Sequence, residues 1–439
     1  AMKIQTKIGL LECFSDCPQR VIFEKQALAQ CNHPFVVSMA YAFQTQSLTL
    51  MVMELCSAGT LLEAAAECPG NVLPPERLVF YAAEIVSALA FIHRMGLIYR
   101  DVKPHNILLN ADGHIQLVDM GGVIDVGGAV LGYDNNKDEM EGVFAGTPKN
   151  VGEVSANLRG YHRRAPAPGP PPTKLNGPQG GEVYDTESRI NGRLAAIVDE
   201  TDNSSVVGDR PLGSSSSKTP PNGSVNLDGS SNHSYKMARA MTMKRATSVM
   251  GTGGYIAPEI LAMVAEGSQH LNGYTASVDY WSLGVTIFKL MTNKLPFQHQ
   301  QLSGFVAYVL ATPDDPLKKS LPKDYKHFMS CIYTSCMFDQ PTQDFFNMMM
   351  ELDATTRPGR GTASVEKIHN LQYFKDIDWY VISQKSIKPP YTPHLDVNKD
   401  TDHSPVPPHS FEEMLNDYGH VKWLRKHPSM RYQKYFESW

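Results

Sequence analysis

The stretch that decides the fold runs over residues 99–121 and reads YRDVKPHNILLNADGHIQLVDMG. It contains two acids, Asp101 near its start and Asp119 near its end. Lys103 stands two residues after the first acid, and Asn106 stands five residues after it. The apolar residues between Asn106 and Asp119 favour a short hairpin. Such a hairpin brings the two acids to the same part of the molecule.

These residue types suit the transfer of a phosphate group. Asp101 can accept the proton of an incoming hydroxyl, and Lys103 can hold a terminal phosphate against charge repulsion. Asn106 and Asp119 offer hard oxygen ligands to Mg²⁺. Four such groups in one order are a far more specific signal than a single glycine-rich motif. The alternative is a chance strand-loop-strand in an unrelated α/β protein, which the further motifs below disfavour.

The composition is that of an ordinary globular protein. A chain of 439 residues is long enough for a large core or two domains, and an apolar fraction of 42% excludes disorder throughout. The net charge of -5 comes without a long basic run, so we expect no nucleic-acid partner. We also expect no transmembrane segment, because no apolar stretch is long enough to span a bilayer.

The cysteines are scattered. There are seven, an odd number, and none forms a CxxC pair. This predicts reduced thiols, and therefore a cytoplasmic location, with the nucleus or recruitment to a membrane as alternatives. Histidines at zinc-ligand spacing are missing from the neighbourhood of these cysteines, so we interpret them as packing residues.

Hydrophobic patterns predict several elements. Residues 48–54 form an apolar run typical of a buried strand. A helix is expected from Pro75 to Gly96, because apolar residues recur near the helical period between them. Residues 278–291 are apolar nearly all round, which is typical of a helix inside a large helical region. Further helices are expected over residues 302–310, 344–352 and 364–371.

Two segments have a different character. Residues 125–239 are rich in Gly, Ser, Pro, Asn and charge, and we interpret them as a disordered, low-complexity insertion. A structured inserted domain is the alternative. Residues 377–439 begin Pro-rich and end with aromatic and basic residues. They are expected to form a tail that crosses a domain surface rather than a separate core.

From its start to about residue 392, and leaving out the insertion, the chain resembles the AGC group of serine/threonine protein kinases. Tyr99 before Arg-Asp is an AGC habit, Lys103 marks serine/threonine kinases, and GTGGYIAPE (251–259) is similar to the end of their activation segment. The resemblance implies an α+β, bilobal fold. It also implies transfer of the γ-phosphate of ATP, with Mg²⁺, to Ser or Thr hydroxyls of protein substrates. Within the group, the chain most resembles the G protein-coupled receptor kinases.

The resemblance also implies a division of the chain. Residues 1–56 would form an incomplete small lobe, from the third strand to the hinge. Residues 57–376 would form a large, mainly helical lobe, interrupted by the insertion inside the activation segment. Residues 377–439 would be the AGC tail. Long insertions at this place are similar to those of Greatwall-type relatives.

The first residues would supply the nucleotide site. Ala-Met-Lys at the start looks like the third-strand motif, so Lys3 would contact the α- and β-phosphates and Glu24 would pair with it. The alternative for Lys3 is a frayed terminal lysine. Met53 would be the gatekeeper, and Glu54 to Cys56 would be the hinge that offers backbone groups to adenine.

Other matching residues would support the catalytic loop. Thr252 would lie beside the catalytic Asp101. Glu259 would pair with Arg357 in a buried structural ion pair. Asp279 would brace the catalytic loop through backbone N–H groups, with a helix N-cap as the alternative.

The chain departs from the family pattern near its start. No Gly-rich loop precedes Lys3, where kinases place backbone amides over the phosphates. We therefore expect an N-terminally truncated chain that binds ATP weakly and turns over poorly. Met120 replaces the usual Phe of Asp-Phe-Gly and fills the same apolar slot.

Two further departures concern the protein substrate. Thr60 and His105 stand where arginine-reading AGC kinases carry glutamates. Without these carboxylates the site loses its main attraction for arginine upstream of the acceptor. The hypothesis is a preference for neutral or acidic sequence contexts.

Ser248 lies at the usual activation phosphosite. A phosphate there could pair with Arg100, beside the catalytic Asp, and order the segment. Arg245, three residues upstream, suits an activating kinase that acts in trans. The alternative is an ordinary loop serine.

A rival hypothesis from another class is a pseudokinase or scaffold that recruits partners through its insertion and tail. The missing Gly-rich loop favours it. The presence of all six charged or amide groups of the motif opposes it, because drift usually removes at least one. They are Lys3, Glu24, Asp101, Lys103, Asn106 and Asp119.

Overall fold

The computed structural model describes residues 1–14, 18–126, 251–266, 273–359, 362–393, 430–437 and 439. They contain both helices and strands, as predicted for an α+β protein. Nearly all of the expected insertion at 125–239 lies outside the described residues, as does the middle of the expected tail. Within the described part, no helix is long and apolar enough to cross a membrane.

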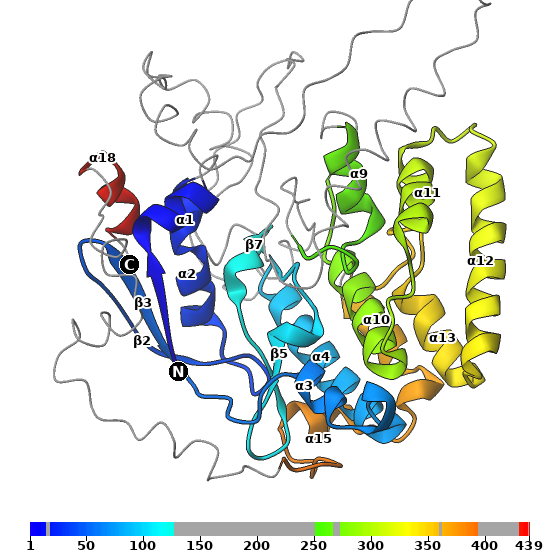
Figure 1. Cartoon of the computed structure of the whole chain (residues 1–439), viewed down its shortest axis with the longest axis horizontal. Helices are drawn as coiled ribbons and strands as arrows, with labels where there is room; N and C mark the ends of the chain where they lie inside the picture. Colours follow the sequence, from blue (N-terminus) through cyan, green and yellow to red (C-terminus); the bar gives the residue numbers. More distant parts are fainter. Residues whose placement is uncertain (15–17, 127–250, 267–272, 360–361, 394–429, 438) are drawn as a thin grey trace, which may run out of the picture.

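A three-stranded antiparallel sheet forms one side of the molecule (Figure 1). Its strands are β1 (Met2–Thr6), β2 (Met39–Gln44) and β3 (Leu48–Met53), with β3 in the centre. The predicted strand at 48–54 is thus confirmed, and its central position explains why Leu48, Leu50 and Met51 are buried. In the register of β1 on β3, Lys3 lies opposite Met51.

Two helices and a 3₁₀ turn accompany this sheet. They are α1 (Lys7–Cys13), η1 (Pro18–Ile22) and α2 (Phe23–Gln30). Thr6 is the N-cap of α1, because its side chain accepts a hydrogen bond from the N–H of Gly9. One face of α2 is buried, with Phe23, Ala27 and Leu28 in the core. Together with the sheet, these elements are called the sheet region below.

The larger part of the molecule is mainly helical and is called the helical region. Its two central helices are α4 (Pro75–Arg94) and α10 (Ser277–Thr292), which pack against each other. Both were predicted. Pro75 suits the first turn of α4, and Gly96 follows its end with a positive φ of 80° that favours glycine. Most of α10 is buried, as its apolar sequence indicated.

Two short ribbons lie between the two regions (Figure 1). One pairs β5 (Ile107–Leu109) with β6 (Ile115–Leu117), which is the hairpin expected after Asn106. The other pairs β4 (Leu97–Ile98) with β7 (Ile124–Asp125). These ribbons enclose residues 99–106 and 118–123, so the two acids of the deciding stretch are held on the same side.

Further helices complete the helical region. They are α3 (Leu61–Ala66), α9 (Pro258–Glu266), α11 (His299–Leu310), α12 (Leu317–Cys336), α13 (Gln340–Met349), α14 (Thr362–His369) and α15 (Trp379–Ser383). The helix expected at 344–352 starts earlier because Asp339 caps α13 through the N–H of Thr342. Helix α12 was missed. It is polar overall, contains Pro322 and buries only a narrow stripe.

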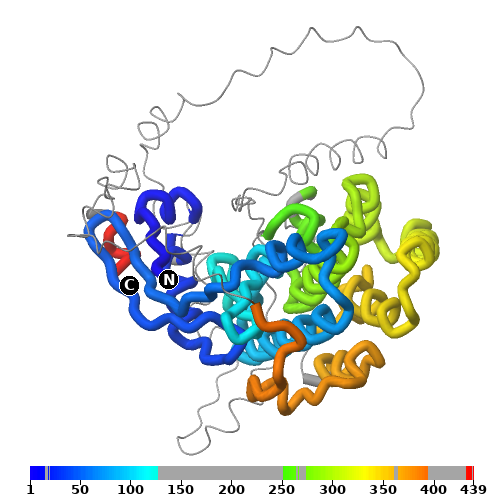
Figure 2. The backbone as a smooth tube through the Cα atoms, turned by 60° about the horizontal axis from the view of Figure 1, so that its bottom comes forward, coloured from blue at the N-terminus to red at the C-terminus, as the bar shows by residue number. Residues whose placement is uncertain are grey.

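Both described parts of the C-terminal segment lie on other elements. After α15, Lys385 pairs with Asp112 at 2.8 Å, and the Arg77 guanidinium stacks on the Tyr391 ring. At the end of the chain, α18 (Met430–Gln433) and η6 (Lys434–Phe436) lie beside the sheet region (Figure 2). Phe436 is buried there with Leu10 and Val21.

Candidate active site

One buried acid fixes the backbone of the segment after β4. Asp279 on α10 is 0% exposed, and its two carboxylate oxygens accept hydrogen bonds from the N–H groups of Tyr99 (2.9 Å) and Arg100 (2.7 Å). His93, at the end of α4, contacts the same carboxylate at 2.7 Å. Arg100 has a positive φ of 71°, a strained conformation that these contacts stabilise. The N-cap of α10 is Ala276 and not Asp279.

Above this support, Asp101 is the centre of a compact hydrogen-bonded cluster. Its Oδ1 accepts from the Thr252 hydroxyl at 2.7 Å, and its Oδ2 lies 2.9 Å from the Lys103 ammonium. Lys103 also donates to the Thr252 hydroxyl at 2.6 Å. The Asn106 amide donates to Asp101 Oδ2 at 2.7 Å. Residues that are far apart in the sequence therefore surround one carboxylate.

A second cluster joins the sheet region to Asp119. The Lys3 ammonium lies 2.6 Å from Glu24 Oε1 and 2.9 Å from Asp119 Oδ1. Asp119 itself has a positive φ of 56° and accepts a hydrogen bond from the N–H of Gly121. Lys3 is thus held on both sides in a strand of the sheet, so it is not a frayed terminal residue.

The charged groups of this second cluster shift one another's pKa values. Burial alone would lower the pKa of Lys3, but Glu24 and Asp119 outweigh it, and the pKa lies above its ordinary value. Burial would raise the pKa of Asp119, but Lys3 and the Gly121 N–H outweigh it and hold this pKa below its ordinary value. Burial raises the pKa of Glu24, which Lys3 only partly opposes. Asp119 therefore stays ionised at neutral pH.

Both clusters line one cavity of about 260 Å³. Asp101 and Thr252 face it from the helical region, and Lys3 and Glu24 face it from the sheet region. Asp119 lies between them with 42% of its side chain exposed. The two acids predicted to act together therefore share a cleft. Sequence reasoning missed other lining residues, among them Gln5, Cys13 and Arg20.

The predicted hinge residues lie elsewhere. Met53, Glu54 and Cys56 do not belong to the lining of this cavity. Met53 ends β3 and exchanges backbone hydrogen bonds with Ala1 at 2.7 and 2.8 Å. Glu54 and Cys56 follow, and both contact Gln116 on β6. This segment is the connection from the sheet to α3.

The oxygen ligands present fit a magnesium ion. Asp119 is ionised and partly exposed, and its Oδ2 is not the oxygen that contacts Lys3. The Asn106 amide nitrogen donates to Asp101, which leaves the amide oxygen, Oδ1, to serve as a metal ligand. One carboxylate and one amide oxygen beside phosphates are typical Mg²⁺ ligands. Within the described residues, no group of three His, Cys, Asp or Glu side chains forms a complete metal site.

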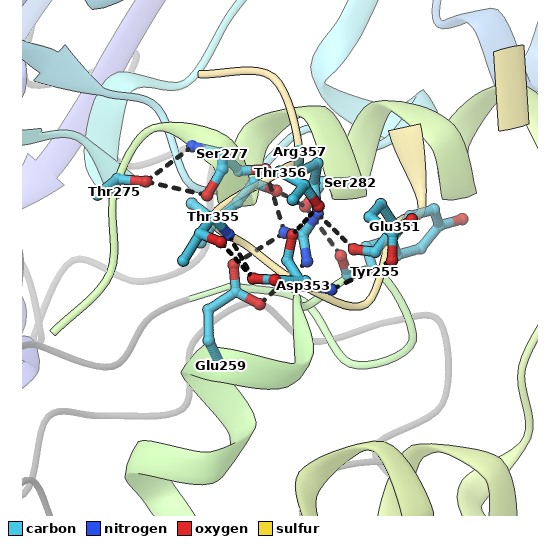
Figure 3. Close-up of polar contacts among 11 residues, drawn as sticks. Tyr255, Glu259, Thr275, Ser277, Ser282, Glu351, Asp353, Thr355, Thr356 and Arg357 are labelled. Atoms are coloured by element: carbon cyan, nitrogen blue, oxygen red, sulfur yellow. Dashed lines mark hydrogen bonds and ion pairs between the residues drawn. The ribbon is translucent and has the colours of Figure 1, made fainter. Parts of the chain in front are cut away.

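A buried ion pair holds the first turn of α9 (Figure 3). Arg357 Nη1 lies 2.8 Å from Glu259 Oε1, and Nη2 lies 3.3 Å from Oε2. The same guanidinium donates to the carbonyls of Ser277 and Glu351. The pairing of Glu259 with Arg357 was predicted, and the two carbonyl contacts were not.

Three residues beside the two acids are buried. Tyr99 is fully buried, and its hydroxyl donates to the carbonyl of Val118, next to Asp119. Met120 is also fully buried, as expected for the apolar slot it fills. The Arg100 guanidinium donates to the Gly122 carbonyl and to the Tyr274 hydroxyl. Ser248 lies outside the described residues, and so does any contact with it.

Comparison with known proteins agrees with this geometry. The protein kinase domain matches residues 1–135 and 234–374, which is more than half of the chain. Protein kinase PINOID 2 of Arabidopsis thaliana is 26% identical over 91% of this chain and 70% of its own length. Serine/threonine-protein kinase nrc-2 of Neurospora crassa is 26% identical over 91% of this chain and 46% of its length.

Ribosomal protein S6 kinase alpha-2 of Mus musculus is 24% identical over 87% of this chain and 33% of its own length. The chain thus spans less than two thirds of the length of several relatives. These relatives are of the AGC type that the sequence resembles. The chain therefore belongs to the protein kinase domain family, among relatives that are serine/threonine kinases.

Proposed function

We propose that this protein is a serine/threonine protein kinase that transfers the γ-phosphate of ATP to Ser or Thr hydroxyls of protein substrates. The observation that carries the proposal is the shared cavity. A carboxylate that Lys103 contacts and a threonine face it from one region. A lysine held by two acids faces it from the other. A cleft with both sets of groups suits an anionic phosphate donor and a hydroxyl acceptor.

In this proposal the roles follow from the contacts. Asp101 orients the acceptor hydroxyl and takes its proton, while Thr252 and Lys103 fix the carboxylate. Lys103 also neutralises charge on the transferred phosphate. Lys3, held by Glu24, binds the α- and β-phosphates. Catalysis then depends mainly on positioning and on charge stabilisation.

Asn106 and Asp119 are the proposed holders of Mg²⁺. When bound, the ion supplies positive charge that stabilises the phosphates during transfer. Tyr99 would keep the backbone before Asp119 in place through its hydrogen bond to Val118. The raised pKa of Lys3 keeps this residue charged, so it stays attractive to phosphate at neutral pH.

The proposed organisation is two-lobed. Residues 1–56 form a small lobe up to the hinge, and residues 57–376 form a large lobe with an insertion over 125–239. Residues 377–439 form the tail. The separation of a sheet region from a helical region supports this division. The proposed hinge is 54–56, with Met53 before it, because this segment leaves the last strand of the sheet. The closer likeness to receptor kinases stays part of this proposal.

The function is tested by a radiolabelled-phosphate transfer assay on a panel of protein substrates with Mg-ATP. We expect incorporation into Ser and Thr that disappears in the Asp101→Asn variant. A thermal shift with Mg-ADP provides a readout that does not depend on turnover. A chain that is neither stabilised by Mg-nucleotide nor able to transfer phosphate would favour the scaffold hypothesis, which the intact charge clusters do not support.

The proposed substrate preference is for neutral or acidic contexts. Thr60 uses its hydroxyl to cap α3, where it accepts from the N–H of Glu63. The Glu63 carboxylate in turn accepts from the N–H of Thr60. An oriented peptide library tests this preference on wild type and on a Thr60→Glu/His105→Glu variant. Arginine upstream of the acceptor should be favoured only by the variant, and a wild-type profile dominated by Arg would refute the proposal.

Phosphorylation of Ser248 by an upstream kinase is proposed as the activating event. The buried Arg100 guanidinium lies beside the catalytic loop and supports this role. Stoichiometrically phosphorylated protein should show a higher kcat than the Ser248→Ala variant treated in the same way. Equal kcat values for the two would indicate an ordinary loop serine.

A further inference from the structure

One side chain between the two regions contacts both ends of the segment that leaves the sheet. Gln116 lies on β6, between the two regions, and is only 3% exposed. Its Nε2 donates to Glu54 Oε2 at 2.8 Å. Its Oε1 accepts from the Cys56 thiol at 3.2 Å. The segment 54–56 is therefore clamped from one residue outside it.

The two halves of the amide match their partners. A glutamine side chain provides one acceptor oxygen and one donor nitrogen, which is what a thiol donor and a carboxylate acceptor require. Glutamate at this position would place two carboxylates together. Methionine would fill the same space but would remove both hydrogen bonds.

Strand β6 also joins the two regions through its backbone. The N–H of Leu117 donates to the carbonyl of Phe35, and the N–H of Val37 donates to the carbonyl of Leu117, both at 2.9 Å. Successive side chains of a strand point to opposite faces, so Gln116 faces away from Leu117. Its backbone neighbours thus hold the strand to the loop before β2 while its side chain holds residues 54–56.

The start of β6 is anchored in the helical region. The Glu84 carboxylate on α4 is 0% exposed and lies 2.5 Å from His114 Nδ1. It also accepts from the N–H of Ile115 at 3.0 Å. A strand fixed in this way is a rigid base for Gln116. Glu54 has a second partner from the sheet region, the Ser38 hydroxyl at 3.2 Å.

We propose that Gln116 is a positioning residue that sets nucleotide affinity by holding the backbone of 54–56 in the conformation that binds adenine. This inference rests on the proposed function, in which that backbone pairs with the base. Gln116 touches neither the phosphate cavity nor the catalytic acids. Its loss therefore weakens nucleotide binding and leaves phosphate transfer in the bound complex intact.

The test measures the Kd of a fluorescent N-methylanthraniloyl ADP with Mg²⁺, together with KM for ATP and kcat. Gln116→Glu and Gln116→Met should each raise the Kd and the KM about tenfold. The Met variant loses both hydrogen bonds, whereas the Glu variant loses the bond to Glu54 and places two carboxylates together. We expect kcat to change less than about twofold. Gln343→Met is the matched control, since the side chain of Gln343, on α13, donates a hydrogen bond to the Phe338 carbonyl far from residues 54–56. It should leave the Kd unchanged.

An exchange of partners separates a positioning role from a general loss of stability. In the double variant Glu54→Gln/Gln116→Glu, the donor and acceptor swap sides, and the new carboxylate can still accept from the Cys56 thiol. We expect the double variant to recover most of the affinity lost in Gln116→Glu. A purely structural defect would not be rescued.

The outcomes are distinct. If the wild type binds no nucleotide, the proposed function fails and this inference fails with it. If the wild type binds and Gln116→Glu binds as tightly, only this inference is overturned. Parallel increases in Kd for Gln116→Glu and Gln116→Met, with rescue in the exchange variant, support it.

Discussion

Two sets of acids in this molecule make similar contacts for different ends. Asp279 and Glu259 lie inside the helical region, and protein donors surround their carboxylates. Asp101 and Asp119 lie at the cavity, with 14% and 42% of their side chains exposed. The first set does not line the cavity, whereas the second does. In the proposed function, only the second set exchanges a protein partner for substrate or metal. Similar pairings therefore support the structure in one place and remain available for chemistry in the other.

The largest effect on catalysis is expected at Asp101. The Asp101→Asn substitution keeps the shape and removes the base, so kcat should fall about 10³-fold, equivalent to about 4 kcal/mol of transition-state stabilisation. The midpoint of thermal unfolding should stay close to that of the wild type. Steady-state kinetics and calorimetry on the same preparation measure both. A variant that keeps more than a tenth of the wild-type kcat contradicts the assigned role.

Arg357→Ala should have the opposite profile. It leaves Glu259 buried without its partner, which costs about 3–5 kcal/mol of the free energy of unfolding. The cost should appear in urea denaturation, while kcat per folded molecule stays within a few-fold. The double variant Arg357→Ala/Glu259→Ala is the control, because it removes the unpaired charge and should be less destabilised than Arg357→Ala alone. An undisturbed urea midpoint in Arg357→Ala would remove the distinction between the two sets.

The sequence predicted the site better than it predicted the frame around it. Asp101, Lys103, Asn106 and Asp119 are readable because they stand at fixed intervals within one short stretch. The contacts with Thr252 and Lys3 join segments that are far apart in the chain, and only the family resemblance anticipated them. Local patterns alone do not encode such pairings.

Elements without a strong local pattern were missed. Helix α12 buries Tyr325, Met329 and Tyr333 on a narrow stripe of an otherwise polar helix. Gln116 and Glu84 were not singled out either, since a lone polar residue in a strand or helix gives no sign of its partner. Their importance comes from burial, which depends on the assembled core.

A histidine outside both sets of acids gives a further measurable effect. His33 lies 3.3 Å from the Ser87 hydroxyl, and burial, with a smaller contribution from Arg94, lowers the pKa of His33 to about 4 from 6.5. Between these values the unfolded chain binds the proton and the folded chain does not. This contribution to stability is therefore complete above pH 6.5 and is lost as the pH falls towards 4.

The expected size of this contribution is at most about 3–4 kcal/mol, at about 1.4 kcal/mol per pH unit. Urea unfolding of wild type and His33→Asn across this range measures it. The difference between the two proteins should narrow steadily as the pH falls. Parallel curves of unfolding free energy against pH for the two proteins would show that His33 has the same pKa in the folded and unfolded states. Any loss of stability in acid would then come from carboxylates.

The smallest effect is expected at Thr60. Substitutions there can separate a structural role, the capping of α3, from contact with the substrate. Thr60 and Glu63 satisfy each other in a capping box at the start of α3, so Thr60→Ala should cost about 1 kcal/mol of the free energy of unfolding. Thr60→Ser keeps the cap and should cost little. In the proposed function Thr60 matters to the substrate only through the missing carboxylate, so Thr60→Ala should leave kcat/KM for a neutral peptide unchanged. If kcat/KM falls in Thr60→Ala but not in Thr60→Ser, the hydroxyl itself contacts the substrate. Thr60 would then serve both the helix cap and substrate binding.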